Sequence, residues 1–466
     1  MNSLMNRTLV ILFLACATGH AHAQDLDCPG EVSLNGGSIE VEASDSGDDT
    51  DNIQCALDAA IDGGYRDVFL VSGEYSIGPI EATGFVGDLR GAGKVRTSVA
   101  IRDSSLSCDG EMGVALRFQV GAASVRNLTL LTDSPCGDGG DATVIAYYSN
   151  PDKCSSRTTF GNVDRVAFVG MGTSGLDTVS GVVMGAAPGC DEDNERILGT
   201  LKVNRSDMTD LDFGIITSIA GGGQVDVNFN VFEGVGLPLT IVDASQSTTV
   251  LNNTFNYNNV PGYPAGTSLG TTAVFIASTE NSPAKNSTAL KNNKFVDAGS
   301  SSVGYGILVG QRDKNVGHSM LLSANTFTGN AANTGGGGVA AIDTNDGLIS
   351  ANRFSGSAAT WIDLRSGDPA NGYVGGPVSG WAIVANDFSA SQATTDISLG
   401  TRTSGIIVGK SQDLPSVTDE TGNNDVLESS SGGFYSNGAS ARETGLTPVR
   451  VLFDQQLRAV QTFRRD

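Results

Sequence analysis

The sequence lacks a second long apolar run and has few basic residues. Beyond Ala17, no stretch is long and apolar enough to span a membrane as a helix, so a helical membrane protein is excluded. Only 28 Lys and Arg stand against 51 Asp and Glu, a formal net charge of −23. This charge argues against nucleic acid and anionic lipid as partners, and a polyanionic substrate would need cations or a local basic patch.

The first 23 residues resemble a secretory signal peptide. Arg7 is their only charge, an apolar run extends from Leu9 to Ala17, and Ala21-His22-Ala23 fits a small-x-small cleavage site. A lipoprotein signal ending at Cys16 is the alternative, but the residues Phe13-Leu14-Ala15 fit it poorly. We therefore expect a secreted or periplasmic protein with no membrane span, and we expect it to be a monomer.

Histidine is nearly absent from the expected mature chain, and the cysteines are confined to its first half. His318 is the single histidine after residue 23, and no Cys-x-x-Cys pair occurs, which disfavours a metal cluster of these residue types. An even number of cysteines in an exported chain predicts disulfide bonds, with 15 pairings open, although Cys136–Cys154 would close a local loop. The six cysteines are Cys28, Cys55, Cys108, Cys136, Cys154 and Cys190.

A short pattern, Asn followed two residues later by Phe, recurs in the second half of the chain. The steps between copies are unequal, from the short step Phe232–Phe255 to the long step Phe255–Phe295. Irregular repeats of roughly 20–50 residues predict a solenoid whose loops vary in length from coil to coil. The copies are Asn230-Val231-Phe232, Asn253-Thr254-Phe255, Asn293-Lys294-Phe295, Asn325-Thr326-Phe327, Asn352-Arg353-Phe354 and Asn386-Asp387-Phe388.

The residue types predict a solenoid of strands. Each copy is short and rich in β-branched and aromatic residues, and the segments between copies are rich in Gly, Ser, Asn and Thr without a long helical periodicity. If the coils stack in register, each Phe lies on the next Phe inside, and each Asn lies on the next Asn at a turn. The sequence therefore predicts an all-β, single-domain parallel β-helix.

Residues 45–101 carry a specific family resemblance. Asp48-Asp49-Thr50 precede a short amphipathic helix, with Asp49 or Thr50 as N-cap, and Gly63-Gly64 ends the helix. A strand, Val68–Val71, the turn Gly73-Glu74-Tyr75, and Leu89-Arg90-Gly91-Ala92-Gly93 follow. This order resembles the N-terminal cap and first coils of the pectate-lyase-like superfamily of right-handed parallel β-helices. The resemblance implies that the helix covers the open end of the core.

We expect four segments along the chain. Residues 1–23 are the signal peptide, 24–62 an N-terminal cap with the amphipathic helix, 63–428 the parallel β-helix, and 429–466 a C-terminal loop and cap. Within the last segment, Val449–Phe453 is a candidate strand and Gln455–Phe463 a candidate helix.

A second family of strands lies between the Asn-x-Phe copies, and polar or charged residues follow several of them. These strands are Thr240-Ile241-Val242-Asp243, Val274-Phe275-Ile276-Ala277, Ile307-Leu308-Val309-Gly310, Ala340-Ala341-Ile342-Asp343 and Trp361-Ile362-Asp363. As one face of the same helix, they would line a groove along the outside. The candidate site residues beside them are Arg312, Lys314, His318, Asp343, Asp363 and Arg365.

The family resemblance implies activity on acidic polysaccharides, which suit a long lateral groove. A lyase removes the C5 proton of a uronate, and it needs a base and a cation or arginine beside the carboxylate. Arg312, Lys314, His318 and Arg365 are the right residue types for these two roles, with Arg312, Lys314 or His318 as the base candidates. The candidates for an acid or a Ca²⁺ ligand are Asp343 and Asp363.

A hydrolase and a non-catalytic protein are the alternatives. Stacked coils lie about 4.8 Å apart, so Asp343 and Asp363 in one column on adjacent coils would approach the roughly 5–5.5 Å of a retaining pair. The chain lacks the N-T-D, D-D and H-G series of polygalacturonases, the D-P-H-D of uronan epimerases and the arginine motif of pectate lyases. No catalytic residue therefore transfers by motif, and a surface or glycan-binding β-helix without activity remains the second hypothesis.

Overall fold

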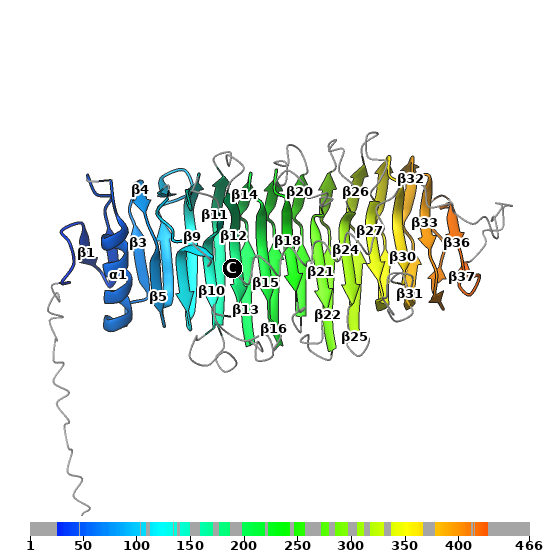
Figure 1. The fold of residues 1–466 in the computed structure, drawn as a ribbon, viewed down its shortest axis with the longest axis horizontal. Helices are drawn as coiled ribbons and strands as arrows, with labels where there is room; N and C mark the ends of the chain where they lie inside the picture. The colour runs from blue at the N-terminus through cyan, green and yellow to red at the C-terminus, as the bar shows by residue number, and fades with distance from the viewer. Residues whose placement is uncertain are drawn as a thin grey trace, which may run out of the picture.

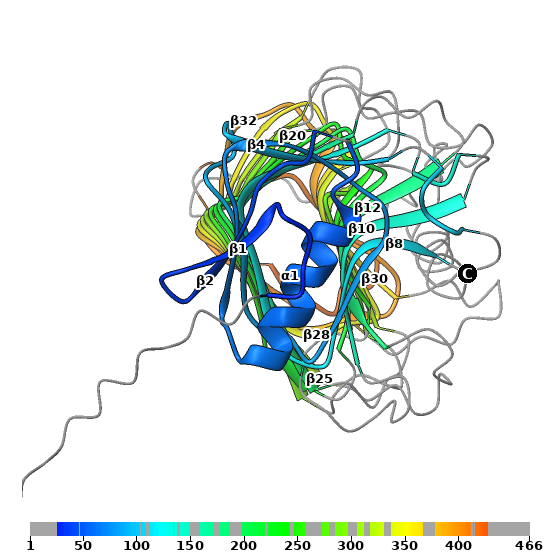
Figure 2. The same cartoon turned by 90° about the vertical axis from the view of Figure 1, so that its left-hand side faces the viewer.

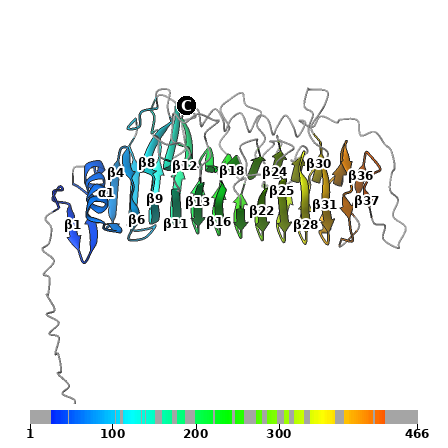
Figure 3. The same ribbon diagram turned by 90° about the horizontal axis from the view of Figure 1, so that it is seen from below.

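The chain winds into a ladder of parallel strands that runs the length of the molecule. In this computed structural model, Figures 1 and 3 show the strands side by side along the long axis, from α1 at one end to β37 at the other. The structure describes residues 26–426, except 46, 103, 109–111, 134, 138–139, 150–158, 171–176, 187–197, 220–221, 243–246, 257–271, 279–284, 297–304, 312–316, 330–336, 367–377, 412 and 414.

Each coil contributes strands to two sheets. Among the described residues, sheet A has 25 strands and forms two sides of the coil, and sheet B has 12 strands and forms the third. The strands of sheet B are β5 (Ile80–Thr83), β8 (Gly113–Gln119), β10 (Gly140–Tyr148), β12 (Asp177–Gly185), β15 (Phe213–Ser218), β18 (Leu237–Val242), β21 (Val274–Ser278), β24 (Tyr305–Gln311), β27 (Gly337–Ile342), β30 (Thr360–Arg365), β33 (Thr395–Leu399) and β36 (Val417–Asp419).

Sheet A bends in the middle, so most of its coils contribute two strands to it. On the first side lie β3 (Asp67–Leu70), β6 (Val86–Gly91), β13 (Leu198–Asn204), β16 (Gly222–Asn228), β19 (Ser247–Leu251), β22 (Lys285–Lys291), β25 (Gly317–Ser323), β28 (Asn345–Ser350) and β31 (Val378–Val384). On the second side lie β4 (Gly73–Ile77), β7 (Thr97–Ile101), β14 (Asp207–Thr209), β17 (Val231–Glu233), β20 (Thr254–Asn256), β23 (Lys294–Val296), β26 (Thr326–Gly329), β29 (Arg353–Gly356) and β32 (Asp387–Ser391). Two long strands, β9 (Ala122–Thr132) and β11 (Thr159–Gly170), cover both sides. The remaining strands of sheet A are β1 (Val32–Asn35) and β2 (Ser38–Val41) at the N-terminal end and β34 (Thr403–Ser404), β35 (Ile407–Val408) and β37 (Asp425–Val426) at the other end.

The repeated phenylalanines form one buried stack inside the coil, as the sequence predicts. Phe232 pairs in register with Phe255, and Phe295 with Phe327, in parallel ladders. Neighbouring ring centroids are 4.6 to 5.0 Å apart along the whole stack, including Phe388 at its end. The all-β parallel β-helix prediction is therefore confirmed.

Glycine in sheet B leaves room for this stack. A Cβ atom on Gly306 would lie 2.9 Å from the ring of Phe327, and one on Gly338 would lie 2.9 Å from the ring of Phe354. Such contacts are too short for any real side chain. The rings therefore pack directly against the backbone of the opposite wall.

The repeated asparagines form a buried ladder at the bend of sheet A. The backbone N and Nδ2 of Asn253 donate to Oδ1 of Asn293 at 2.9 and 3.0 Å, and Nδ2 also donates to the carbonyl of Val227 at 2.8 Å. Asn293 makes the same three bonds with Asn325 and Val250. Because each amide is satisfied only by its neighbours on adjacent coils, the ladder fixes the register of the stack.

The residue before each asparagine of this ladder is left-handed, and so is the equivalent residue on the three preceding coils; we call this series the left-handed column. Its φ angles lie between 52° and 60°. Its residues are Asn127, Arg165, Arg205, Phe229, Asn252, Asn292, Ala324, Ala351 and Ala385. This conformation turns the chain sharply from the first side of sheet A to the second.

The N-terminal end of the core is covered by helix α1 (Thr50–Gly63), which lies across the end of the coil in Figure 2. Ile53, Ala56, Leu57 and Ala60 are its buried apolar residues, and Gly64 ends it in the left-handed conformation. Asp49 occupies the N-cap position, but its carboxylate accepts hydrogen bonds from the backbone N of Ser44 and of Ser76 rather than capping the helix.

Strands on both sides of α1 complete this end. The antiparallel hairpin of β1 (Val32–Asn35) and β2 (Ser38–Val41) precedes the helix, and β2 pairs in parallel with β3. The predicted turn Gly73-Glu74-Tyr75 is wrong, because these residues form strand β4, whose ladder partner is β7.

Two disulfide bonds tie this end together. Cys28 bonds to Cys55 of α1, and Cys108 bonds to Cys136. The Cys136–Cys154 pairing suggested by sequence is therefore wrong, because the coil register brings Cys108 beside Cys136. Cys154 and Cys190 lie outside the described residues, as do the predicted signal peptide and C-terminal cap. Within the described part of the chain, no helix is long and apolar enough to cross a membrane.

Truncation of one ring in the stack tests the core. Phe327→Ala should lower the free energy of unfolding by about 3–5 kcal/mol, because a buried cavity replaces the ring between two others. Val95→Ala, at a fully exposed position, should change it by less than about 0.5 kcal/mol. Urea denaturation of both variants measures these differences, and equal stabilities would contradict the described core.

Candidate functional site

The structure describes only part of the predicted site. Arg312 and Lys314 lie outside the described residues. His318 lies on β25, where its backbone is in register with Asn286 of β22. Asp343 follows β27, and Asp363 and Arg365 both belong to β30.

The predicted alignment of Asp343 with Asp363 is wrong. The register pairs Asp363 with Ala340 and Arg365 with Ile342, so Asp343 lies one residue beyond Arg365 rather than beside Asp363. A shift of three residues along a strand is about 10 Å. The two carboxylates therefore do not form the closely spaced pair of a retaining hydrolase.

Asp343 instead forms a tight turn between β27 and β28. Its φ angle of 52° is left-handed, and its backbone N donates to the carbonyl of Arg365 at 3.3 Å. Asp tolerates this conformation better than most residues. The left-handed turn alone accounts for an aspartate at this position, so no catalytic role is needed to explain it. Asp343 belongs to the turn that connects sheet B to sheet A.

Asp363 and Arg365 form an ion pair on one face of β30. Nε of Arg365 donates to Oδ1 of Asp363 at 2.9 Å, and Nη2 donates to Oδ2. The side chain of Asp363 is 1% exposed, whereas that of Arg365 is 34% exposed. The pair thus places a buried anion beneath a cation that reaches solvent.

Tyr305 joins this pair from the first residue of β24. Its hydroxyl donates to Oδ2 of Asp363 at 3.4 Å, and the residue is 5% exposed. Tyr305 is two coils before Asp363, since β24 pairs with β27 and β27 with β30. We call Tyr305, Asp363 and Arg365 the β30 cluster.

The surroundings hold two members of the β30 cluster in fixed protonation states. Burial raises the pKa of the Tyr305 hydroxyl far above its ordinary value, and the charge of Asp363 raises it further. Burial alone would lower the pKa of Arg365, but the carboxylate of Asp363 outweighs it and holds this pKa above the ordinary range. Arg365 therefore stays a cation, and this state fits the cation beside a carboxylate among the two roles that the sequence left open to it.

The β30 cluster lies at the end of an apolar strip on the outer face of sheet B. Ile307 and Ile362 point into the core, whereas Leu308, Ala340 and Asp363 lie in the outward column, where they are buried as well. In the outward column, Phe275 pairs with Leu308, Leu308 with Ala340, and Ala340 with Asp363. Asp363 is thus the first charged residue after three apolar ones, and a buried charge at such a position needs its partners.

Sequence reasoning missed Tyr305. A Tyr at the start of a strand is ordinary by β propensity, and its contact with Asp363 spans 58 residues. Only the coil register brings them together, and loops of unequal length hide that register in the sequence.

The acidic residues give little support to a Ca²⁺ site at Asp363, because both of its carboxylate oxygens already accept bonds from Arg365 and Tyr305. Among the residues that the structure describes, no group of three or more His, Cys, Asp or Glu is placed to hold a metal ion.

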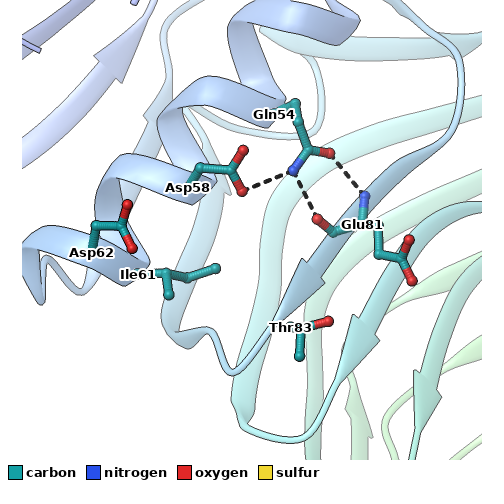
Figure 4. Close-up of a pocket in the computed structure, with 6 residues that line it drawn as sticks. All are labelled: Gln54, Asp58, Ile61, Asp62, Glu81 and Thr83. Atoms are coloured by element: carbon teal, nitrogen blue, oxygen red, sulfur yellow. Dashed lines mark hydrogen bonds between the residues drawn. The ribbon is translucent and has the colours of Figure 1, made fainter. Parts of the chain in front are cut away.

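A pocket of about 660 Å³ lies elsewhere, between α1 and β5 (Figure 4). Gln54 dominates its polar contacts. Its Nε2 donates to Oδ1 of Asp58 and to the carbonyl of Glu81, and its Oε1 accepts from the backbone N of Glu81. These bonds join the helix to the first strand of sheet B, so the pocket is part of the cap.

The fold defines the class of protein: a right-handed parallel β-helix, as the resemblance in residues 45–101 implies. No known protein family matches the sequence, and no curated protein matches it either.

Solved structures with a similar course of the chain exist, at low identity. The A-module of the Azotobacter vinelandii mannuronan C-5 epimerase AlgE4 is 16% identical, with a TM-score of 0.42, over 85% of this chain and 96% of that one. The Dettilon tailspike protein is 12% identical, with a TM-score of 0.43, over 83% and 70%. The catalytic domain of a GH87 α-1,3-glucanase is 11% identical, with a TM-score of 0.23, over 83% and 70%.

The buried hydroxyl of Tyr305 predicts a dependence of stability on alkaline pH. Because its pKa is raised on folding, its contribution is complete below about pH 10, the ordinary tyrosine pKa, and is lost as the pH rises above it. The free energy of unfolding of the unmodified protein should therefore fall more steeply above about pH 10 than that of Tyr305→Phe. Urea denaturation at a series of pH values measures both slopes, and parallel curves would show that Tyr305 is not buried as described.

Proposed function

We propose that this chain is an exported β-helix protein that binds a uronate-containing polysaccharide at the Arg365 end of the outer face of sheet B, where the cluster reaches solvent, and acts on it as a lyase. The observation that supports the proposal is the β30 cluster, which places a permanent cation and a neutral phenol together on this face. Clusters of buried, perturbed ionisable groups are enriched at functional sites.

Arg365 would bind the carboxylate of the sugar. Asp363 uses two of the five N–H donors of the guanidinium and orients its plane. A third of the side chain reaches solvent, so other donors can meet a carboxylate. Charge on this carboxylate grows as the C5 proton leaves, and a fixed cation stabilises that change.

Tyr305 would act as a proton donor. Its raised pKa keeps the hydroxyl protonated throughout the neutral range. In β-elimination, the oxygen of the broken glycosidic bond gains a proton, and a phenol can supply it. The base in this proposal is His318, whose ordinary pKa lies near neutrality and whose strand begins at the same corner of the coil where β30 ends.

Hydrolysis is less well supported. The offset between Asp343 and Asp363 removes the candidate pair of acids, and Asp363 is already bound by Arg365. The mannuronan epimerase and the α-1,3-glucanase are remote likenesses in fold and add no argument about chemistry.

Binding without catalysis is the second candidate function. The burial of Tyr305 and Asp363 favours it, since the β30 cluster as described also braces three coils and leaves only Arg365 open to a ligand. Under this alternative, the polysaccharide binds and no bond is broken.

Turnover and binding on a panel of polysaccharides test the proposal. Polygalacturonate or alginate, with and without Ca²⁺, should yield an ultraviolet-absorbing unsaturated uronate. Tyr305→Phe and Arg365→Lys should each lower kcat/KM at least about tenfold, which is about 1.4 kcal/mol, at a temperature where circular dichroism shows each variant to be folded.

The matched control is Arg353→Lys, an exposed arginine of sheet A that pairs with Asp387. It should leave turnover unchanged. Binding without product would establish the non-catalytic alternative, and neither binding nor product would refute the proposal as a whole.

A further inference from the structure

The left-handed column contains a residue that its conformation does not favour. Phe229 has a φ angle of 60°, whereas its equivalents on the next two coils are asparagines, which tolerate this region, and those beyond are alanines. A bulky aromatic side chain at such an angle is an outlier. Strain of this kind persists where the surroundings impose it, and it often coincides with function.

Burial does not compensate this strain. Phe229 is 59% exposed, although most large apolar side chains of the described residues are buried in the core. Its backbone N donates to the carbonyl of Leu251 at 3.0 Å, a bond that any residue at this position could make. The fold therefore requires a left-handed residue here, and it does not require a phenylalanine.

The neighbours of Phe229 in the column are polar and lie one coil apart. The backbone N of Arg205 donates to the carbonyl of Asn228, and that of Asn252 to Lys291, each at 3.0 Å, so successive residues repeat at the strand spacing of about 4.8 Å. Arg165 and Arg205 precede Phe229 on adjacent coils, and Asn252 and Asn292 follow it.

The two arginines are positioned by one carboxylate. Asp164 lies within 2.6 Å of Nη2 of Arg205 and within 3.7 Å of Nε of Arg165. Both arginines remain about half exposed, whereas the side chain of Asp164 is mostly buried. In a chain with a formal net charge of −23, the column thus presents two cations and no acidic side chain of its own.

This combination matches the chemistry of an anionic sugar chain. The C–H face of a pyranose packs on an exposed aromatic ring, hydroxyl groups bond to side-chain amides, and guanidinium groups bind carboxylates in pairs of hydrogen bonds. A strip one residue wide and several coils long suits a linear polymer better than a protein surface, which needs a broad patch.

We propose that the left-handed column around Phe229 is a second polysaccharide-binding site, for an anionic chain that runs across the coils. It goes beyond the function proposed for the β30 cluster and does not depend on it. The column lies at the bend between the two sides of sheet A, across the core from sheet B. In Figure 2, sheet B strands β8, β10, β12 and β30 lie to the right, and sheet A strands β20 and β25 lie at the top and bottom of the coil.

The decisive variant is Phe229→Asn, because asparagine occupies this column position in the next two coils. It removes the ring and relieves the backbone. We expect the melting temperature to stay equal or rise, while affinity for alginate and polygalacturonate in gel electrophoresis and calorimetry falls at least about tenfold. Arg205→Gln should weaken the binding of these two anionic probes and leave any binding of neutral dextran unchanged.

Phe160→Asn is the matched control, since Phe160 is 46% exposed on sheet A but lies outside the column. It should bind both anionic probes as the unmodified protein does. If the unmodified protein binds neither anionic probe, the proposal is overturned. It is also overturned if the Phe229 and Phe160 variants lower the affinity for these probes equally. A change of oligomeric state in Phe229→Asn without any change in glycan affinity would assign the column to contact between copies of the chain and would overturn it too.

Discussion

Hydrogen bonds between stacked asparagine side chains hold the register on which the rest of this structure depends. The side-chain amide of Asn253, for example, donates to the side chain of Asn293 on the next coil and to the backbone carbonyl of Val227 on the previous coil. A slip by one residue would therefore leave several buried polar groups unpaired. The same register stacks the phenylalanine rings face to face and fits them against the glycines of the opposite wall. Apolar packing thus supplies stability, and the asparagine ladder supplies specificity.

The two proposed binding sites, the β30 cluster and the left-handed column, depend on that register. On sheet B, it brings Tyr305 to Asp363, two coils further on, and separates Asp343 from Asp363. At the bend of sheet A, it lines up the left-handed residues, so that Phe229 stands between arginines and asparagines at one-coil spacing. Tyr305 and Asp363 are 58 residues apart in the sequence, and the members of the left-handed column come from successive coils, so both arrangements would vanish if the coils were shifted.

The features that repeat along the chain could be predicted from the sequence. The features that depend on the lengths of the loops between coils could not. Because each Asn-x-Phe copy aligns with the next one, the copies show which residues stack on each other. The phenylalanine stack and the asparagine ladder could therefore be predicted. Asp343 and Asp363 could not be aligned, because Asp343 forms a tight turn after β27 whereas Asp363 lies within β30. The pairing of Cys136 with Cys108 follows the same logic, since proximity here is set by one turn of the coil rather than by the shortest loop.

Removal of one amide from the ladder tests this account most directly. Asn325→Ala removes the acceptor of the backbone N of Asn293, one of the two acceptors of its Nδ2, and the donor to the carbonyl of Leu290, and it should lower the free energy of unfolding by at least about 3 kcal/mol. Asn292→Ala, in the left-handed column where alanine occurs naturally three times, should cost about 1 kcal/mol or less. Hydrogen exchange at the Asn293 amide should accelerate in the first variant alone. Equal, small losses in the two variants would contradict the claim that the ladder sets the register.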